Sequence, residues 1–217
     1  MRMLVLFLAF ATVLPAFAQA APAAPAAPPA SASASDAATA AKRRTEALIG
    51  TFKKVKKGGE KENAAAFREL DGFLAFDALI EGALASRADR FTPAQRREFE
   101  STFRTLLREI AYPNSGRFFT DAQVKIAGAQ AQGDVAVVKL DAYVPAEDLE
   151  TEVGVHWKEI DGALRIVDVS FDGDSLVLDY RNQFAAIIDA EGVDGLLRKV
   201  KQRLEEVRKG GAAKPKE

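Results

Sequence analysis

Hydrophobic residues recur three and four positions apart along the first half of the chain, a spacing that is typical of helices with one buried face. The stretches before residue 90 carry Leu48, Ile49, Phe52 and Val55, then Phe67 and Leu70, and then Phe76, Leu79, Ile80, Ala83 and Leu84. Lys56-Lys57-Gly58-Gly59 ends the first stretch and Asp71-Gly72 ends the second. This half of the chain is therefore predicted to be helical.

A further helix has the clearest start in the sequence. Thr92-Pro93-Ala94-Gln95 is a capping box with proline at the first helical position. The apolar positions that follow at helical spacing are Phe99, Phe103, Leu106, Leu107 and Ile110. We expect this helix to end in the segment 112–116, where proline, asparagine and glycine lie close together.

Beyond residue 121 the hydrophobic period changes to two, which favours strands. The segments with this pattern are 122–129, 135–144, 149–160 and 164–171. Their short connections, including the turn signal Asp161-Gly162, predict an antiparallel meander. In the last segment Leu164 and Ile166 share one parity, whereas Val167 and Val169 share the other. We therefore expect a bulge there, or burial on both faces.

Two helices are predicted to close the chain, one on each side of Gly192. Their apolar stripes are Leu176, Val177, Tyr180, Phe184, Ile187 and Ile188, followed by Val193, Leu196, Leu197, Val200, Leu204 and Val207. The predicted class is α+β, with N-terminal helices, a four-stranded antiparallel twisted sheet and two C-terminal helices.

The first residues have the order of parts of a secretory signal peptide. Arg2 supplies a positive charge, an apolar run continues through Leu14, Pro15 breaks it, and small residues up to Ala20 fit an A-x-A cleavage site. The run is shorter than the roughly 20 residues that span a bilayer. We therefore expect residues 1–20 to be a cleaved signal peptide that directs export.

Composition divides the remaining chain. Residues 21–41 are almost entirely Ala, Pro and Ser, which bury too little apolar surface to offset their ordering entropy, so we expect a disordered linker. Residues 42–209 suffice for one domain, and residues 210–217 are expected to form a flexible tail. The chain has no cysteine. We therefore expect neither a disulfide framework nor a lipid anchor on an N-terminal cysteine.

Charge and chemistry narrow the function classes. The net charge of −1 argues against nucleic acid as the main partner. The C-terminal stretch is locally basic, with Arg198, Lys199, Lys201, Arg203, Arg208, Lys209, Lys214 and Lys216. We interpret these residues as a solvated helix face and tail, and a docking face for an acidic partner or lipid headgroups is the alternative.

Candidate catalytic and metal-binding residues are few. The single histidine, His156, lies on the polar side of a predicted strand, where a surface role is favoured over that of a catalytic base. Asp172-Gly173-Asp174 resembles the start of a calcium loop but lacks its later oxygen ligands, so we interpret it as a turn leading into a helix. A zinc site would need several carboxylates, which is uncommon. No metal or cofactor is expected.

Several motifs resemble those of a known family, MlaC, the periplasmic phospholipid-binding component of the Mla lipid transport system. Residues 166–184 look like its signature of a strand ending in Asp-Val, a Gly-x-Ser turn and a helix with an Arg-x-x-Phe core. Residues 192–197 resemble its next motif, and residues 92–99, with Phe103 and Leu107, resemble its TPxQRxxF helix. Trp157-Lys158 fits its sheet.

The resemblance implies a periplasmic carrier, not an enzyme, that shuttles phospholipid and serves outer-membrane lipid asymmetry. The implied partners are a phospholipid, an inner-membrane ABC transporter with its lipid-binding ring subunit, and an outer-membrane lipoprotein complex. Exposing about thirty methylenes to water would cost on the order of 20 kcal/mol, so we expect buried acyl chains, an exposed headgroup and an apolar cavity between sheet and helices. The expected lining residues are Leu79, Ile80, Ala83, Phe103, Leu107, Val138, Leu140, Val153, Val155, Trp157, Tyr180 and Phe184.

The sequence departs from the family pattern at three places and leaves two other functions open. Ala85 follows Leu84 where the family has glycine, Ala88 takes an aromatic position, and Pro113 interrupts the expected helix. One alternative is an enzyme on a cone-shaped α+β fold that acts on an apolar substrate through His156 or Asp168. The other is a structural or adaptor protein with a solid core.

Overall fold

The computed structural model describes residues 32–56 and 58–210. Its helices are α1 (Ala32–Phe52), α2 (Glu60–Asp71), α3 (Phe76–Leu84), η1 (Ala85–Arg90), α4 (Pro93–Leu106), η2 (Leu107–Ala111), α5 (Tyr112–Asp121) and α6 (Leu176–Gly210). Its strands are β1 (Gln123–Gln132), β2 (Val135–Val144), β3 (Leu149–Ile160), β4 (Ala163–Phe171) and β5 (Asp174–Ser175). The predicted α+β class is confirmed. The predicted signal peptide and the segment 211–217 lie outside the described residues.

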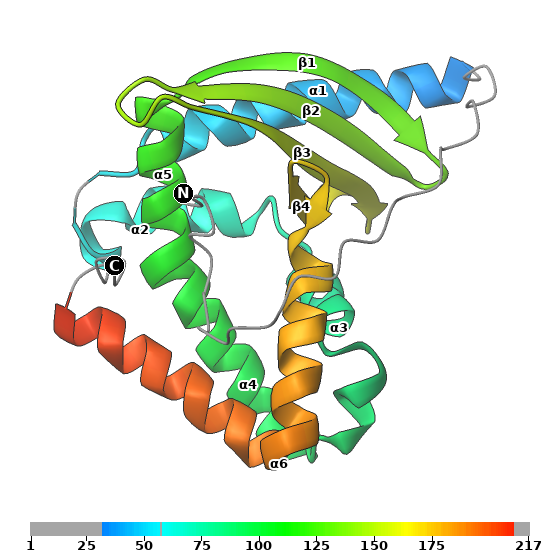
Figure 1. The fold of residues 1–217 in the computed structure, drawn as a ribbon. Coiled ribbons are helices and arrows are strands. Elements are labelled where there is room, and N and C mark those ends of the chain that lie inside the picture. The colour runs from blue at the N-terminus through cyan, green and yellow to red at the C-terminus, as the bar shows by residue number, and fades with distance from the viewer. Residues whose placement is uncertain (1–31, 57, 211–217) are drawn as a thin grey trace.

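The strands form one antiparallel sheet in the order β1-β2-β3-β4-β5 (Figure 1). The prediction of four strands is corrected by the two-residue strand β5. Asp172 and Gly173 have φ angles of 51° and 90°, which fold the chain back so that Ser175 pairs with Ser170. Positive φ at two consecutive turn residues is typical of tight hairpins, and this turn leads directly into α6.

The expected irregularity in β4 is a bulge. Trp157 pairs with Ile166 and His156 pairs with Asp168, so Val167 has no partner on β3. The extra residue explains the change of parity in the sequence, because it shifts the side chains beyond it to the other face. Ile166 and Val169 can thus both face the same apolar interior.

The free edge of β4 is covered by the connection between α2 and α3. Ala75 donates its backbone N–H to Ile166 (3.0 Å), and Ile166 donates to Phe73 (2.7 Å). Leu74 and Ile166 form a parallel bridge. Pairing of this kind protects a sheet edge from other chains, and it fixes where α3 begins.

Part of the segment expected to be a disordered linker is helical. α1 begins at Ala32, and Ala41 and Thr45 are fully buried. Alanine has the highest helix propensity, and Ala41, Thr45, Leu48 and Phe52 recur at the spacing of one helix face. Packing of this face against the sheet therefore supplies the burial that composition alone does not suggest. Residues 21–31 lie outside the described residues.

The helix that starts at Thr92 does not end at residues 112–116 as expected. The Thr92 hydroxyl accepts from the Gln95 N–H (3.2 Å), which confirms the capping box. The helix continues through η2, a π-helical turn in which the Tyr112 N–H bonds to the Leu107 carbonyl, and then through α5. Because proline lacks an N–H and crowds the preceding turn, the wider turn accommodates Pro113 without ending the helix.

The two predicted C-terminal helices are arms of α6 that meet at Gly192. Gly192 has φ 74° and ψ 178°, outside the helical region. Glycine adopts this conformation readily because it lacks a Cβ atom. In Figure 1 the two arms form an angle at the base of the molecule, with α4 beside them.

Two hydrophobic cores result. One lies between the sheet and α1, α2 and α5, and includes Trp157, Phe67 and Leu140. The other lies among α3, η1, α4 and α6, and includes Phe99 and Phe184. We call these parts the sheet lobe and the helical lobe; the sheet lies at the top of Figure 1 and the helical lobe at the bottom. The helix from Pro93 to Asp121 runs through both.

Candidate functional site

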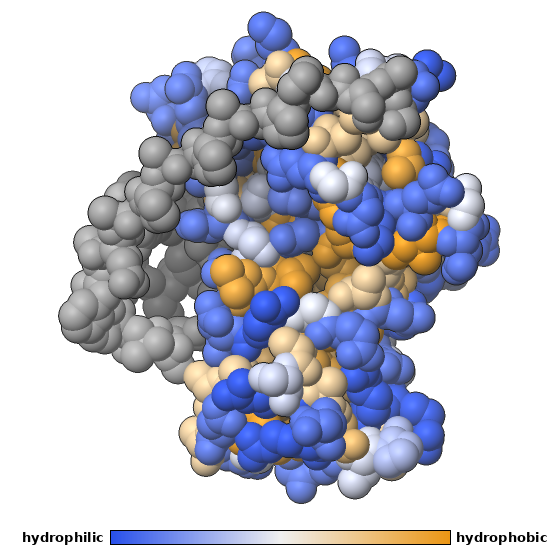
Figure 2. Space-filling model, turned by 90° about the vertical axis from the view of Figure 1, so that its right-hand side faces the viewer, coloured by the Kyte–Doolittle hydropathy of each residue, from blue (hydrophilic) through white to orange (hydrophobic). Residues whose placement is uncertain are grey.

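A cavity of about 260 Å³ lies between the two lobes. Its helices contribute Leu48, Phe52, Leu70, Leu79, Ala83, Phe103, Leu107, Ala111, Tyr112, Phe118, Phe119, Leu176, Val177 and Tyr180, and Leu74 comes from the connection between α2 and α3. The sheet contributes Val144, Val153, Val155, Ile166, Val169 and Phe171. On the face shown in Figure 2, the molecule narrows between an upper and a lower part, and hydrophobic residues reach the surface at this waist.

The cavity is elongated along the helix that joins the lobes. Its lining includes Phe103 on α4, Leu107 and Ala111 on the π-helical turn, and Asp121 at the end of α5. At 1.5 Å per residue, Phe103 and Asp121 are about 27 Å apart along the helix axis. A long apolar wall is thus provided by a single helix, which the sequence analysis expected to stop halfway.

Polar lining residues gather at one end of this wall. Asn114, Ser115, Arg117 and Asp121 come from α5, and Glu147 comes from the turn between β2 and β3. Arg117, Asp121 and Glu147 are exposed. This end of the cavity therefore borders solvent and carries charges of both signs, whereas the walls are apolar except at Asp168 on β4, which also lines the cavity.

Two tyrosines line the cavity in different ways. The Tyr112 hydroxyl donates to Asp71 Oδ1 (2.8 Å), and Asp71 also pairs with Arg108. The Tyr180 hydroxyl is buried without a hydrogen-bond partner among the described residues. Burial raises the pKa of both phenols, with Asp71 adding to the effect at Tyr112 and Asp179 at Tyr180. Both remain protonated and can donate.

The structure brings seven of the twelve predicted lining residues to the cavity: Leu79, Ala83, Phe103, Leu107, Val153, Val155 and Tyr180. The other five lie in the two cores. Ile80 and Phe184 pack in the helical lobe, and Val138, Leu140 and Trp157 pack in the sheet lobe.

Trp157 illustrates why the sequence could not separate these groups. It is fully buried, and its indole N–H donates to the Thr45 hydroxyl on α1 (2.8 Å). Alternation along β3 places Val153, Val155 and Trp157 on one face of the sheet. Where α1 packs on that face, the side chains belong to the core, and only the part that α1 leaves uncovered borders the cavity. The periodicity of the sequence does not reveal which part α1 covers.

The lining residues missed by the sequence analysis are mostly on α1, α5 and the C-terminal ends of β2 and β4. Leu48 and Phe52 were found as a helical stripe, but nothing in the sequence placed that stripe at the cavity. Phe118 and Phe119 follow the expected helix end. Had the helix been predicted to continue past Pro113, both phenylalanines would have been placed on it.

The residues considered for catalysis have structural partners. Asp168 Oδ1 accepts from the backbone N–H groups of Val169 (2.8 Å) and Val177 (3.1 Å), and Oδ2 accepts from the Ser175 hydroxyl (2.5 Å). Ser175 in turn accepts from the Leu178 N–H (3.0 Å). Asp168 and Ser175 thus cap the start of α6, and Asp172-Gly173-Asp174 is the expected turn into a helix.

His156 lies beside Ser170, with Nε2 and the serine hydroxyl oxygen 3.1 Å apart. Its strand neighbours Val155 and Trp157 face the sheet-lobe core, so alternation places His156 on the opposite face. Within the described residues, no carboxylate hydrogen-bonds the imidazole, and no cluster of three His, Cys, Asp or Glu side chains is placed to hold a metal ion. The pair lies away from the cavity.

Comparison with known proteins identifies the family. Residues 42–202 match the family model described as MlaC protein. The chain belongs to the MlaC family. No curated protein matches the chain. Among solved structures, this MlaC-family chain is similar to a phospholipid-binding protein from Ralstonia solanacearum, solved in complex with a phospholipid, with 18% identity and a TM-score of 0.65. The match covers 79% of this chain and 98% of the Ralstonia chain, and at this identity it shows a shared fold.

Two further features bear on how this MlaC-family chain meets membranes and partners. In the part of the chain that the structure describes, no helix is both long enough and apolar enough to span a bilayer. The basic residues of α6 are interleaved with acids. Arg198 and Lys199 pair with Glu191, and Arg208 pairs with Glu109. This pairing favours a solvated helix face over an acidic partner's docking face.

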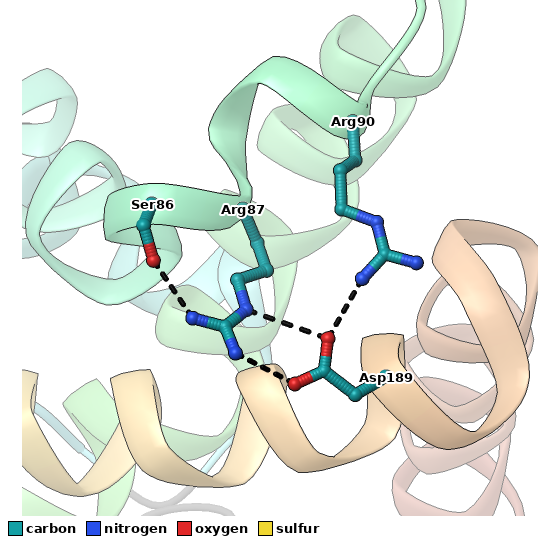
Figure 3. A network of polar contacts seen from close by, with 4 residues as sticks. All are labelled: Ser86, Arg87, Arg90 and Asp189. Carbon is teal, nitrogen blue, oxygen red and sulfur yellow. Dashed lines mark hydrogen bonds and ion pairs between the residues drawn. The ribbon is translucent and has the colours of Figure 1, made fainter.

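One departure from the family pattern has a local consequence. Ala85, where the family has glycine, adopts φ 44° and ψ −125° at the start of η1. This left-handed conformation favours glycine. The segment that follows carries Arg87 and Arg90, which both reach Asp189 on α6 (2.6 and 2.7 Å; Figure 3). The ion-pair cluster thus holds η1 against α6, next to a strained residue at the start of η1.

Proposed function

We propose that this protein binds a phospholipid with its acyl chains in the cavity and its headgroup exposed to solvent. The observation that carries the proposal is the long apolar cavity between two separate cores, in a chain of the MlaC family. Each methylene removed from water contributes about 0.8 kcal/mol, so enclosure of the chains supplies the binding energy. The Ralstonia protein of the same fold, solved with a phospholipid, supports this assignment.

The dimensions support acyl chains as the buried part. The hydrocarbon core of a bilayer is about 30 Å thick, so one chain extends about half of that. The wall from Phe103 to Asp121, about 27 Å at 1.5 Å per residue, is longer than one chain. The volume of about 260 Å³ lies just below the range of roughly 300–1,000 Å³ that is usual for ligand pockets. A two-chain lipid would therefore enter as the walls move apart.

We further propose that the chain acts as a periplasmic carrier rather than an enzyme. Its signal peptide would direct it to the periplasm, where it would shuttle lipid between an outer-membrane lipoprotein complex and an inner-membrane ABC transporter with a lipid-binding ring subunit. This traffic would serve outer-membrane lipid asymmetry.

Lipid extraction and native mass spectrometry of the exported protein test the binding proposal. We expect copurifying phospholipid, and uptake of labelled phospholipid from liposomes by the stripped protein. Leu79→Asp, which places a charge in the cavity wall, should abolish uptake. Leu178→Asp is the matched control, because Leu178 is 47% exposed on α6, and it should leave uptake unchanged. No copurifying lipid and no uptake by the unmodified protein would overturn the proposal.

His156→Ala separates the carrier from the enzyme. In a carrier, lipid occupancy stays unchanged and no lipid is converted, because His156 lies on the opposite face of the sheet from the cavity-lining residues of β3. Transfer from outer-membrane vesicles to vesicles holding the transporter tests the shuttle itself. Time-dependent lipid breakdown that the variant loses would favour the enzyme.

A further inference from the structure

Three buried side-chain atoms in the described part of the chain have no hydrogen-bond partner: the Tyr180 hydroxyl, the Gln183 amide oxygen and the Arg203 Nε. A buried polar group without a partner is costly and uncommon in folded proteins. Only Tyr180 belongs to the cavity lining. Its hydroxyl is therefore a hydrogen-bond donor without a protein partner, carried by a residue of the apolar cavity wall.

The phenol is fixed in place by its surroundings. Tyr180 is 7% exposed, and its ring stacks on Phe184 (5.5 Å between centroids) and meets the edge of Phe103 (6.0 Å). The caps from Asp168 and Ser175 fix the first turn of α6, just before Tyr180. Because the ring is wedged between two aromatic neighbours, it cannot reach solvent without repacking the helical lobe.

The other cavity tyrosine, Tyr112, has the hydrogen-bond partner that Tyr180 lacks. Tyr112 also lines the cavity and is also buried, but its hydroxyl is satisfied inside the protein by Asp71. No comparable acceptor reaches Tyr180, although it is kept protonated by the same burial that raises its pKa. The protein thus carries one satisfied and one unsatisfied donor on the same cavity.

We propose that the Tyr180 hydroxyl donates a hydrogen bond to an acyl ester carbonyl oxygen of the bound phospholipid. This inference rests on the proposed function and adds to it a residue that recognises the linkage between chain and glycerol. Acyl chains offer no acceptor, and the ester carbonyls are the oxygens directly joined to them. The hydrogen bond places the ester region against the first turns of α6, next to Leu176 and Val177. It also makes the carrier selective for ester-linked over ether-linked lipids.

Paired lipids test this selectivity. Uptake of dipalmitoyl phosphatidylglycerol is compared with uptake of its dihexadecyl ether counterpart, which lacks both carbonyl oxygens, from vesicles of otherwise equal composition. The unmodified protein should bind the ester lipid roughly threefold to tenfold more tightly, the usual effect of one hydrogen bond. Tyr180→Phe should lose this preference by weakening binding of the ester lipid alone.

Tyr112→Phe is the matched control. It removes a hydroxyl from the same cavity, and it should leave the ester-to-ether ratio unchanged whatever it does to overall affinity. An ester preference that persists in Tyr180→Phe overturns the inference, and so does an equal loss for both lipids, which would indicate a buried water as the partner. If the unmodified protein binds neither lipid, the proposed function fails, which is a different result. Thermal unfolding of Tyr180→Phe checks that it is folded.

Discussion

The two lobes are held together by different means. In the sheet lobe the core is built from strands that are distant in sequence from α1 and α2, and its buried polar groups are paired, as Thr45 with Trp157 and Tyr112 with Asp71. In the helical lobe the core is mostly aromatic and aliphatic, Tyr180 is left unpaired, and ion pairs on the surface join its helices. Among the described residues, the buried hydroxyl without a partner therefore lies on the helical side of the cavity.

The cavity follows from having two cores instead of one. Each lobe buries its own apolar face, and the helix from Pro93 to Asp121 crosses from one to the other through the π-helical turn at Leu107–Ala111. Residues at the boundary, such as Leu79 and Leu107, are only partly buried. Packing is therefore tight within each lobe and incomplete between them.

Replacing a core residue should cost far more than replacing a wall residue. Trp157→Ala removes a fully buried side chain and leaves the Thr45 hydroxyl without its donor, so we expect a loss of about 4 kcal/mol. Leu79→Ala, at the edge of an existing cavity, should lose only about 1 kcal/mol, because most of the space it vacates is already open. Urea unfolding of both variants measures the difference. Equal losses would mean that the boundary is packed as tightly as the cores.

Replacing Tyr112 or Tyr180 by phenylalanine should have different effects on the stability of the lipid-free protein. Tyr112→Phe removes a hydrogen bond to a carboxylate, and should lower the free energy of unfolding by about 1–2 kcal/mol. Tyr180→Phe removes a buried hydroxyl that has no partner, so it should leave stability unchanged or raise it slightly. Chemical denaturation at pH 7 provides the comparison. A loss in Tyr180→Phe as large as in Tyr112→Phe would show that its hydroxyl has a partner within the protein.

The sequence predicts some elements of the two lobes better than others. β2 and β3 have the predicted bounds, and the bulge at Val167 was visible as a change of parity, because strand patterns reflect local alternation. The twelve predicted lining residues were all on buried faces, but five of them pack in the cores without reaching the cavity. Whether Leu140 meets α1 or a cavity depends on which helix covers that stretch of the sheet, and this is a property of tertiary packing.

Two elements were missed for a different reason, namely that contacts with distant residues decide their structure. Pro113 predicted a helix end, yet the π-helical turn before it accommodates the ring and α5 continues to Asp121. The Ala-rich segment predicted disorder, yet Ala41 docks in the sheet lobe with no exposed surface. Contacts with distant residues offset an unfavourable local preference at Pro113, and at Ala41 they supply the burial that the composition does not suggest.

Restoring glycine at the start of η1 should stabilise the helical lobe. Ala85 has φ 44°, a conformation that costs a residue with a Cβ atom of order 1–3 kcal/mol. Part of this gain is lost because glycine is more flexible in the unfolded chain, so Ala85→Gly should add about 1 kcal/mol. Ala88→Gly is the control, because Ala88 lies in the same 3-10 helix without a positive φ. This variant should be less stable than the unmodified protein by about 0.5–1 kcal/mol. Calorimetry of both variants should show Tm shifts of opposite sign.

The smallest expected effect concerns the ion pairs that join η1 to α6. Arg87, through its hydrogen bond and its charge, and Arg90 hold the pKa of Asp189 below its ordinary value, although burial opposes them. A carboxyl with a lowered pKa stabilises the fold above its unfolded pKa, and this contribution disappears as the pH falls through the folded pKa. Asp189 is about half exposed, so solvent and salt screen the cluster.

Asp189→Asn should therefore lower Tm slightly at pH 7 and low salt, and the difference from the unmodified protein should shrink both below about pH 4 and in 1 M salt. Melting curves over this range of pH and salt measure it. A difference that persists at low pH would mean that Asp189 acts through packing or neutral hydrogen bonds. In that case packing and hydrogen bonds, as in the sheet lobe, would join η1 to α6. The contrast between the two lobes would then rest on the unpaired hydroxyl of Tyr180 alone.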